Sequence, residues 1–178
     1  MQILTERLIL RDFVREDWEQ VHRYASDPGV ATFMIWGPNS IDETKAYMEY
    51  VIRMQEQQER TGFELAVVLR DTNQLIGGCG IHIEGRNAEM GYCFNPEYWG
   101  HGYASEAAQA LVTFGFKEKG VHRIYATCRP GNSSSANVMR RLGMQQEGHL
   151  REHMYHKGQY HDSYLFSILA TEVEEQRQ

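Results

Sequence analysis

The stretch Pro96–Ala107 reads PEYWGHGYASEA and places two glycines between a segment typical of a β-strand and a segment typical of an α-helix. The run before it, Ala88–Phe94, is short, apolar and aromatic, and it ends close to Pro96, which has no N–H to donate to a sheet. The run after it, Ala104–Leu111, repeats apolar residues at helical spacing. Glycine lets a backbone approach a ligand, and free N–H groups at a helix N-terminus attract anions. The stretch therefore predicts a phosphate-binding loop.

Two well-known phosphate-binding patterns do not fit this loop. The dinucleotide fingerprint needs a third glycine at the position of Ser105, and the P-loop needs Gly-Lys followed by Ser or Thr, a triplet that the sequence lacks. A tight turn without any ligand is the alternative interpretation of an isolated Gly-x-Gly. The rest of the chain has to decide between the two.

The periodicity along the chain predicts one α/β domain without repeats. We expect helices over Glu16–Ala25 and after the capping box Ser40–Glu43, and strands over Phe63–Leu69, Leu75–Ile83, Ala88–Phe94 and His122–Cys128. Short turns make the first three strands antiparallel neighbours, whereas the strands on either side of the glycine-loop helix should run parallel through a right-handed crossover. Their ends then meet at one edge of an open sheet, where ligands usually bind.

The loop and several other segments carry a family resemblance. Tyr98–Ala107 resembles the acyl-CoA pyrophosphate loop of the GNAT superfamily of N-acyltransferases. Further segments that resemble the family are Thr5–Arg11 with Ser26–Pro28, Asn132–Val138 with Leu142–Met144, and Gly158–Asp162 with Tyr164–Phe166. The resemblance is greatest to the branch that acetylates the N-termini of ribosomal proteins. It implies an α/β fold with a mixed, splayed sheet flanked by helices, in a single domain over residues 5–169, followed by a C-terminal tail over residues 170–178.

The resemblance also implies that acetyl-CoA is the co-substrate and indicates where it binds. We expect its contacts from Tyr92, Cys93, Phe94, Trp99, Gly100, His101, Gly102, Tyr103, Ala104, Asn132, Ser135 and Asn137. Asn132 can bond the pantetheine amides, or it can simply cap the helix that follows it. The family usually has Gln or Arg at the position of Glu97, so this chain departs from the pattern there.

Acetyl transfer from a thioester to an amine needs oxyanion stabilisation and protonation of the departing thiolate. A backbone N–H of the strand Tyr92–Phe94 is the expected oxyanion donor. Relatives often protonate the thiolate with a Tyr at the position matching Met139, which cannot donate a proton. In the ribosomal-protein branch a Ser takes this role, and it maps to Ser135, which can also be an ordinary residue of a helix start.

The reaction also needs a neutral amine, and the candidate bases are two glutamates. The branch's carboxylate maps to Met154, so that assignment fails. Glu152, expected two residues earlier on the same strand face, and Glu89, at the start of the strand that meets the thioester, are the alternatives, each acting directly or through water. An α-amino group has a pKa near 8, so the amine also arrives partly neutral.

Composition limits the classes of function. The 178 residues suit one domain, and a net charge of −6 with a pI near 5.7 argues against nucleic-acid and anionic-membrane partners. Without a membrane-length apolar run or a signal-peptide core, we expect a soluble, cytoplasmic protein. The three cysteines indicate buried free thiols, and His153, His156 and His161 show no spacing typical of a metal site, so no metal is expected.

The leading hypothesis is an N-acetyltransferase acting on a protein N-terminal α-amine. The alternatives are a small-molecule amine acetyltransferase for a polyamine, amino acid or antibiotic, and a non-catalytic acyl-CoA sensor, which Met139 and Met154 favour. A nucleotide phosphotransferase would need a metal-holding carboxylate cluster that the sequence does not show. We expect Val30–Asn39 and Met154–Tyr164 to select the acceptor, and a homo-oligomer stays open.

Overall fold

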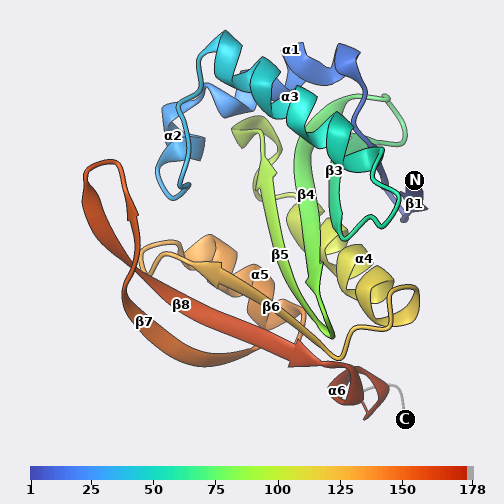
Figure 1. Ribbon diagram of the computed structural model, residues 1–178, viewed down its shortest axis with the longest axis vertical. Coiled ribbons are helices and arrows are strands. Elements are labelled where there is room, and N and C mark those ends of the chain that lie inside the picture. Colours follow the sequence, from blue (N-terminus) through green and yellow to red (C-terminus); the bar gives the residue numbers. More distant parts are fainter. Residues whose placement is uncertain (176–178) are drawn as a thin grey trace.

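The computed structural model describes residues 1–175, which form one eight-stranded mixed sheet with helices on both faces (Figure 1). The order across the sheet is β1-β2-β3-β4-β5-β6-β8-β7. The strands are β1 (Gln2–Leu4), β2 (Leu8–Asp12), β3 (Gly62–Leu69), β4 (Leu75–Glu84), β5 (Asn87–Phe94), β6 (Arg123–Cys128), β7 (Gln145–His156) and β8 (Gln159–Leu169). The predicted strands are therefore confirmed to within one residue at most ends, and the first five form an antiparallel meander.

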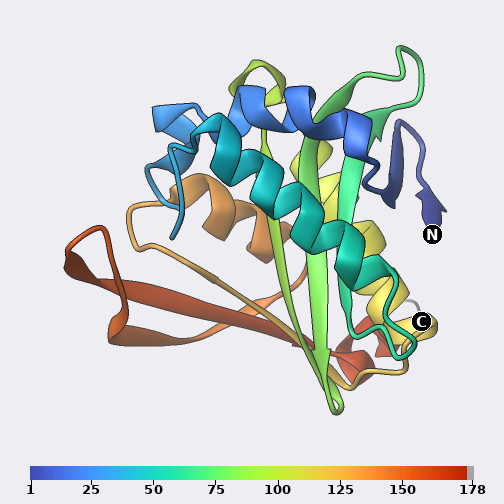
Figure 2. The same ribbon diagram turned by 45° about the horizontal axis from the view of Figure 1, so that its top comes forward.

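Helices cover the sheet in two layers. They are α1 (Trp18–Ala25), α2 (Pro28–Ala31), α3 (Ile41–Gln55), α4 (Tyr103–Lys117), α5 (Ser133–Arg141) and α6 (Ala170–Glu175), with short 3-10 turns at Arg15–Asp17 and Pro96–Tyr98. Figure 2 shows α1 and α3 in front of the central strands with α4 behind them. The first long helix begins at Trp18 rather than Glu16 because Arg15–Asp17 forms a 3-10 turn. The predicted capping box is confirmed, since Ser40 and Glu43 exchange hydrogen bonds at the start of α3.

Strand β3 shows how both helix layers pack against the sheet. Phe63, Leu65 and Val67 belong to the core under α4, while Ala66 and Val68 belong to the core under α1 and α3. Both faces of this strand are buried, so its sequence is almost continuously apolar. The exception is Glu64, which the alternation of the strand places on the α1–α3 face.

The sheet opens between its two parallel strands. Strands β5 and β6 pair only where Asn87–Glu89 lies beside Arg123–Tyr125. Beyond that point β5 stays paired with β4 through Phe94, and β6 stays paired with β8 through Cys128, so the two strands diverge (Figure 1). The splay implied by the family resemblance is confirmed. It leaves the β6-facing edge of Met90–Phe94 without a ladder partner.

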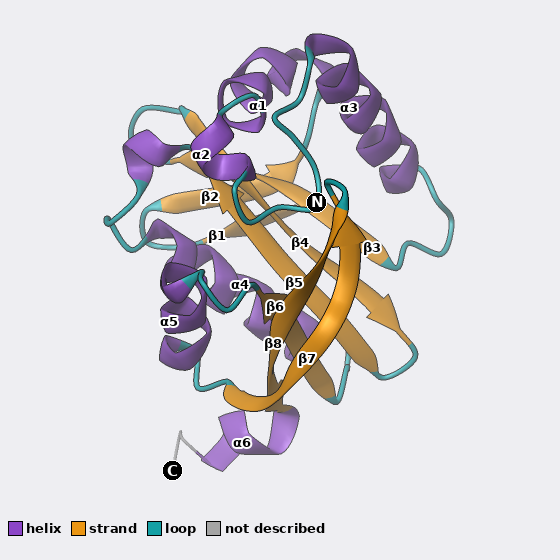
Figure 3. Cartoon of the chain, turned by 90° about the vertical axis from the view of Figure 1, so that its left-hand side faces the viewer, coloured by secondary structure: helices purple, strands orange, loops and turns teal. Residues whose placement is uncertain are grey.

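The last two strands form a long hairpin that stands out from the sheet (Figure 3). Residues 170–175 of the expected tail form α6, and residues 176–178 lie outside the described part of the chain. Over residues 1–175, no helix is both long and apolar enough to cross a membrane. In the same residues, no three His, Cys, Asp or Glu side chains gather in a way that could hold a metal ion.

Candidate active site

The glycine loop has the backbone of an anion cradle. Gly100 and Gly102 have φ values of 80° and 81°, a left-handed conformation that favours glycine. Gly102 directly precedes the 15-residue helix α4, whose first backbone hydrogen bond runs from Glu106 N–H to the Gly102 carbonyl. The N–H groups of Tyr103–Ser105 therefore have no partner within the helix and face outward at its positive end. This geometry supports the predicted phosphate-binding role.

The first turn of α4 also carries an unsatisfied polar group. The hydroxyl oxygen of Ser105 is buried and has no hydrogen-bond partner among the described residues. Buried polar groups are nearly always satisfied, so an orphaned hydroxyl at a helix N-terminus suits a ligand oxygen. The residues at this turn thus fit a pyrophosphate group.

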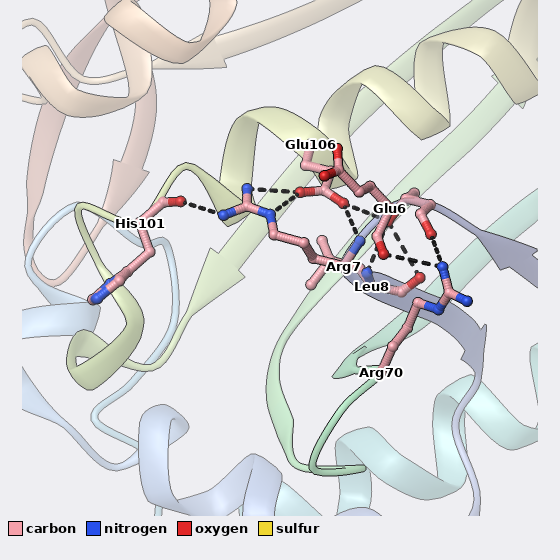
Figure 4. A network of polar contacts seen from close by, with 7 residues as sticks. Glu6, Arg7, Leu8, Arg70, His101 and Glu106 are labelled. Atoms are coloured by element: carbon pink, nitrogen blue, oxygen red, sulfur yellow. Dashed lines mark hydrogen bonds and ion pairs between the residues drawn. The ribbon is translucent and has the colours of Figure 1, made fainter.

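Arg7 braces the loop from the turn between β1 and β2, and the sequence interpretation had assigned it no role. Its Nε donates to Glu106 Oε2 at 2.7 Å, and its Nη1 donates to the carbonyl of His101 at 2.9 Å (Figure 4). Its guanidinium also lies over the ring of Tyr103, 4.6 Å from the centroid. Burial alone would raise the pKa of Glu106, but hydrogen bonds from Thr5 and Arg7 lower it overall, so the carboxylate stays ionised. The only signal for this brace was the place of Arg7 in a segment resembling the family.

The aromatic residues of the loop make contacts within it. Trp99 is 52% exposed, and its indole N–H donates to the carbonyl of Phe94, the last residue of β5, at 2.8 Å. The ring of His101 stacks on Tyr103 with centroids 5.8 Å apart, and its Nδ1 lies 2.8 Å from the Trp99 carbonyl. Glu97 is exposed, and its backbone N–H donates to the Asn95 side chain. The rings therefore order the cradle while leaving much of Trp99 available to a ligand.

The structure brings two predicted residues together across the opening. The hydroxyl of Tyr92 on β5 lies 3.0 Å from the Ser135 hydroxyl on α5 and donates to the Ser135 carbonyl at 3.2 Å. Burial raises the pKa of Tyr92 to about 12, and the hydrogen bond with Ser135 offsets part of this rise. Tyr92 therefore stays protonated at neutral pH. Sequence reasoning had used only the backbone of Tyr92 and missed this hydroxyl.

The other predicted cofactor residues lie around the same opening. Asn132 caps α5, with its side-chain oxygen accepting from Ser135 N–H at 3.1 Å, so the capping alternative is observed and a pantetheine contact stays a prediction. Asn137 is exposed and accepts from Arg140 at 3.1 Å. Burial raises the pKa of Cys93 to about 12, which makes it a thiol rather than a nucleophile. Phe94 is buried, and Ala104 packs partly buried against the same core.

The two candidate bases lie at different levels of the sheet. Glu89 is exposed at the last paired position of β5, beside Tyr125 of β6. Glu152 is exposed on β7, at a level of the sheet beyond the end of β6. Measured along the strand direction, Glu152 is therefore about 10 Å or more from Glu89. The expectation that Glu152 shares a strand face with Met154 is wrong. The register shifts between Leu150 and Met154, and Glu152 has a φ of 50° while its N–H donates to Asp162 at 2.8 Å.

The two segments expected to select the acceptor meet in the structure. Lys157, at the tip of the β7–β8 hairpin, donates to the carbonyl of Ala31 in α2 at 2.6 Å. Tyr155 and Tyr160 on the same hairpin are 64% and 62% exposed and pack edge to face on each other. The hairpin and the α2 region therefore border one side of the opening together.

Comparison with known proteins identifies the family. The model of the acetyltransferase (GNAT) domain matches residues 7–145. The chain belongs to the GNAT acetyltransferases. The uncharacterized N-acetyltransferase YnaD of Bacillus subtilis is 36% identical over 174 residues, which cover 97% of this chain and 99% of that one. A GNAT-family acetyltransferase structure from Bacillus anthracis is 37% identical with a TM-score of 0.86, covering 96% and 99% of the two chains.

Two more distant GNAT proteins are named for their acceptors. Spermidine N(1)-acetyltransferase of Escherichia coli is 25% identical over 164 residues, covering 89% of this chain and 84% of that one. The ribosomal L7/L12 α-N-protein acetyltransferase RimL, solved with coenzyme A, is 22% identical with a TM-score of 0.83, covering 95% and 98%. The chain is thus an acetyl-CoA-dependent N-acetyltransferase, and the unsatisfied groups of the cradle fit that co-substrate.

Proposed function

We propose that this enzyme transfers an acetyl group directly to a primary amine within a ternary complex, and that a protein N-terminal α-amine is its leading acceptor. The observation that carries the proposal is the unpaired edge of Met90–Phe94, which runs from the opening of the sheet towards the cradle. An extended pantetheine arm can pair with such an edge, as another strand would. Acetyl-CoA supplies the thioester, and the protein supplies position, donors and a proton.

The residues around the opening divide the chemistry. A backbone N–H on the free edge of Tyr92–Phe94 stabilises the negative charge that develops on the thioester oxygen. The amine nitrogen bonds to the carbonyl carbon and loses an N–H proton to water, the C–S bond breaks, and the thiolate takes a proton. Ser135 gives that proton, the hydrogen bond that Ser135 shares with Tyr92 at 3.0 Å stabilises the charge left on its oxygen, and water returns a proton to Ser135.

The missing carboxylate at Met154 supports an α-amine as acceptor. An α-amino group has a pKa near 8, whereas a lysine-like amine has one near 10.4, so at neutral pH the α-amine is neutral roughly two hundred times more often. An α-amine therefore needs less help from a base than a lysine-like amine does. The ribosomal-protein acetyltransferase among the structural neighbours supports the same acceptor class.

A polyamine is the second candidate. It is favoured by the spermidine acetyltransferase relative and by the net charge of −6, because an acidic protein attracts polycations. The two candidates differ in the number and pKa of their amines. An acceptor panel therefore separates them.

The test is thiol release from acetyl-CoA with three acceptors. The first is a lysine-free peptide with a free N-terminus, the second is a peptide whose N-terminus is blocked and whose only amine is one lysine side chain, and the third is spermidine. We expect release with the free N-terminus and much less with the other two. Release with spermidine alone would replace the protein acceptor with a polyamine. Binding of acetyl-CoA without release for any amine would overturn the enzymatic proposal in favour of a sensor.

A further inference from the structure

On one face of the sheet beside the opening, two paired glycines leave the backbone uncovered by side chains of their own, and we call this surface the glycine floor. Gly80 on β4 pairs with Gly91 on β5 on one side and with Glu64 on β3 on the other. A Cβ placed on Gly91 would meet nothing within 4 Å, whereas a Cβ on Gly80 would lie 2.5 Å from Glu64 Oε1 and 2.7 Å from Oε2. The carboxylate of Glu64 therefore lies directly over Gly80, and open space adjoins it above Gly91.

This carboxylate is held in place by two neighbours. Its Oε1 lies 2.6 Å from Nε2 of His82 on β4, and its Oε2 accepts from the Tyr47 hydroxyl of α3 at 3.3 Å. The side chain of Glu64 is 22% exposed and that of His82 is 48% exposed. Within residues 1–175, His82 is the only ion-pair partner of Glu64. Glu64 is thus a mostly buried carboxylate that keeps access to solvent.

The glycine floor is next to the expected position of the thioester. Gly91 directly precedes Tyr92–Phe94, the part of β5 whose backbone N–H groups are proposed to contact the thioester oxygen. On the opposite face of β5, Met90 and Phe94 pack into the core with α4 and α5, so that face is filled. An amine must therefore approach over Gly91. Because neighbouring strands lie about 4.8 Å apart, the Glu64 carboxylate is roughly one strand spacing from that path.

We propose that Glu64 binds the acceptor amine and takes up its proton, and that His82 is a positioning residue that holds the carboxylate and shares the proton. This role rests on the proposed acetyltransferase function and adds a base to it. An ammonium N–H proton passes to a Glu64 oxygen directly or through one water, and the freed lone pair bonds to the carbonyl carbon as the C–S bond breaks. The nitrogen then loses a second proton to water, and the departing thiolate takes its proton from Ser135. The proton leaves the Glu64–His82 pair for solvent after the product departs.

The pair predicts an acid limb in the pH–rate profile. The hydrogen bond with Glu64 raises the pKa of His82, and burial offsets part of the rise. The pair accepts a proton only above that pKa, so activity should fall as pH drops through it. The other titratable groups near the pair are Tyr24 of α1, Tyr47 of α3, Cys79 of β4, and Glu89 and Cys93 of β5. Burial raises the pKa of Tyr24 and Tyr47 well above the ordinary value, so both stay protonated across this range.

Glu64→Gln tests the proposal, because it keeps the shape of the side chain and removes its charge. We expect kcat/KM for the acceptor to fall about 100- to 1,000-fold with loss of the acid limb, while the Kd for acetyl-CoA stays unchanged. Glu84→Gln is the matched control, because it removes an exposed carboxylate from the same face of the sheet and should leave both quantities unchanged. Unchanged acetyl-CoA binding also shows that the variant is folded. A wild-type profile in Glu64→Gln would overturn the role of Glu64.

Two glycine variants distinguish the contribution of the Glu64 carboxylate from that of the open space above Gly91. Gly80→Ala pushes Glu64 away and should lower kcat and alter the acid limb. Gly91→Ala fills only open space and should raise the acceptor KM with the acid limb intact. Equal effects of the two would overturn the assignment. If the wild type releases no thiol with any amine, both the proposed function and the role of Glu64 are rejected. If the wild type turns over and Glu64→Gln turns over equally well, only the role of Glu64 is rejected.

Discussion

The cradle and the acceptor face show two ways of building a site. The cradle is one continuous stretch, Pro96–Ala107, whose function resides in backbone N–H groups and in two glycines with positive φ. The acceptor face combines Glu64, Gly80 and Gly91 from three strands, and it exists only because the register places them side by side. A site made of local backbone is visible in a sequence, whereas a site made by strand pairing is not.

The largest effect should come from blocking the cradle. Gly102→Trp adds bulk where the α4 N–H groups face outward, so we expect the Kd for acetyl-CoA to rise more than about 100-fold in titration calorimetry, since these N–H groups are the proposed donors to the pyrophosphate. Gly120→Trp is the control, because Gly120 also has a positive φ of 64° and a Cβ there meets nothing within 4 Å. Both variants carry the same backbone strain. Equal loss of binding in the two would show that strain, rather than the cradle, explains the result.

A smaller effect should follow from removing Ser135, the proposed proton donor at the opening. Ser135→Ala takes away the hydroxyl beside Tyr92 but leaves the Asn132 cap, which uses the Ser135 backbone N–H. We expect kcat to fall about 10- to 100-fold, in the lower range for general acid catalysis, with little change in the Kd for acetyl-CoA. Steady-state thiol release measures the first quantity. Ser134→Ala, at an exposed neighbour on α5, should be silent, and a Ser135→Ala enzyme with full kcat would return Ser135 to a purely structural role.

The fold and the cradle were largely predictable from the sequence. Short turns located the connections between the first three predicted strands, alternation located the strands, and the capping box located the start of α3. These signals are local, since each depends on residues a few positions apart. The splay itself was supplied by the family resemblance rather than by any local pattern.

The catalytic side chains were less predictable, for physical reasons. Glu152 was placed by strict alternation, which fails because β7 carries extra residues between Leu150 and Met154 relative to β8. The sequence indicated no role for Glu64, because its partner His82 is 18 positions away in the chain. Arg7 lies 99 positions from Glu106, and nothing in its own segment indicates a contact with the loop. Long-range contacts of this kind need the register and the layers to be known first.

Arg7 sharpens the comparison, because it adds one long-range side chain to an otherwise local site. Arg7→Ala removes the side-chain hydrogen bonds to Glu106 Oε2 and to the His101 carbonyl but keeps the bond from Arg7 backbone N–H to Glu106 Oε1, so the loop loses most of its brace and the cradle loses a nearby positive charge. We expect the KM for acetyl-CoA to rise roughly 5- to 10-fold with kcat at saturation unchanged, which corresponds to a loss of about 1 kcal/mol of net hydrogen-bond stabilisation in the loop. Arg70→Ala is a matched control, because the Arg70 side chain donates to the carbonyls of Thr5 and Glu6 in the same turn, while the backbone bond from Arg70 N–H to the Arg7 carbonyl is kept in the variant (Figure 4). If Arg70→Ala raised KM as much as Arg7→Ala, the turn as a whole would be supporting the cradle. If neither variant changed KM, the local backbone of Pro96–Ala107 would be sufficient by itself.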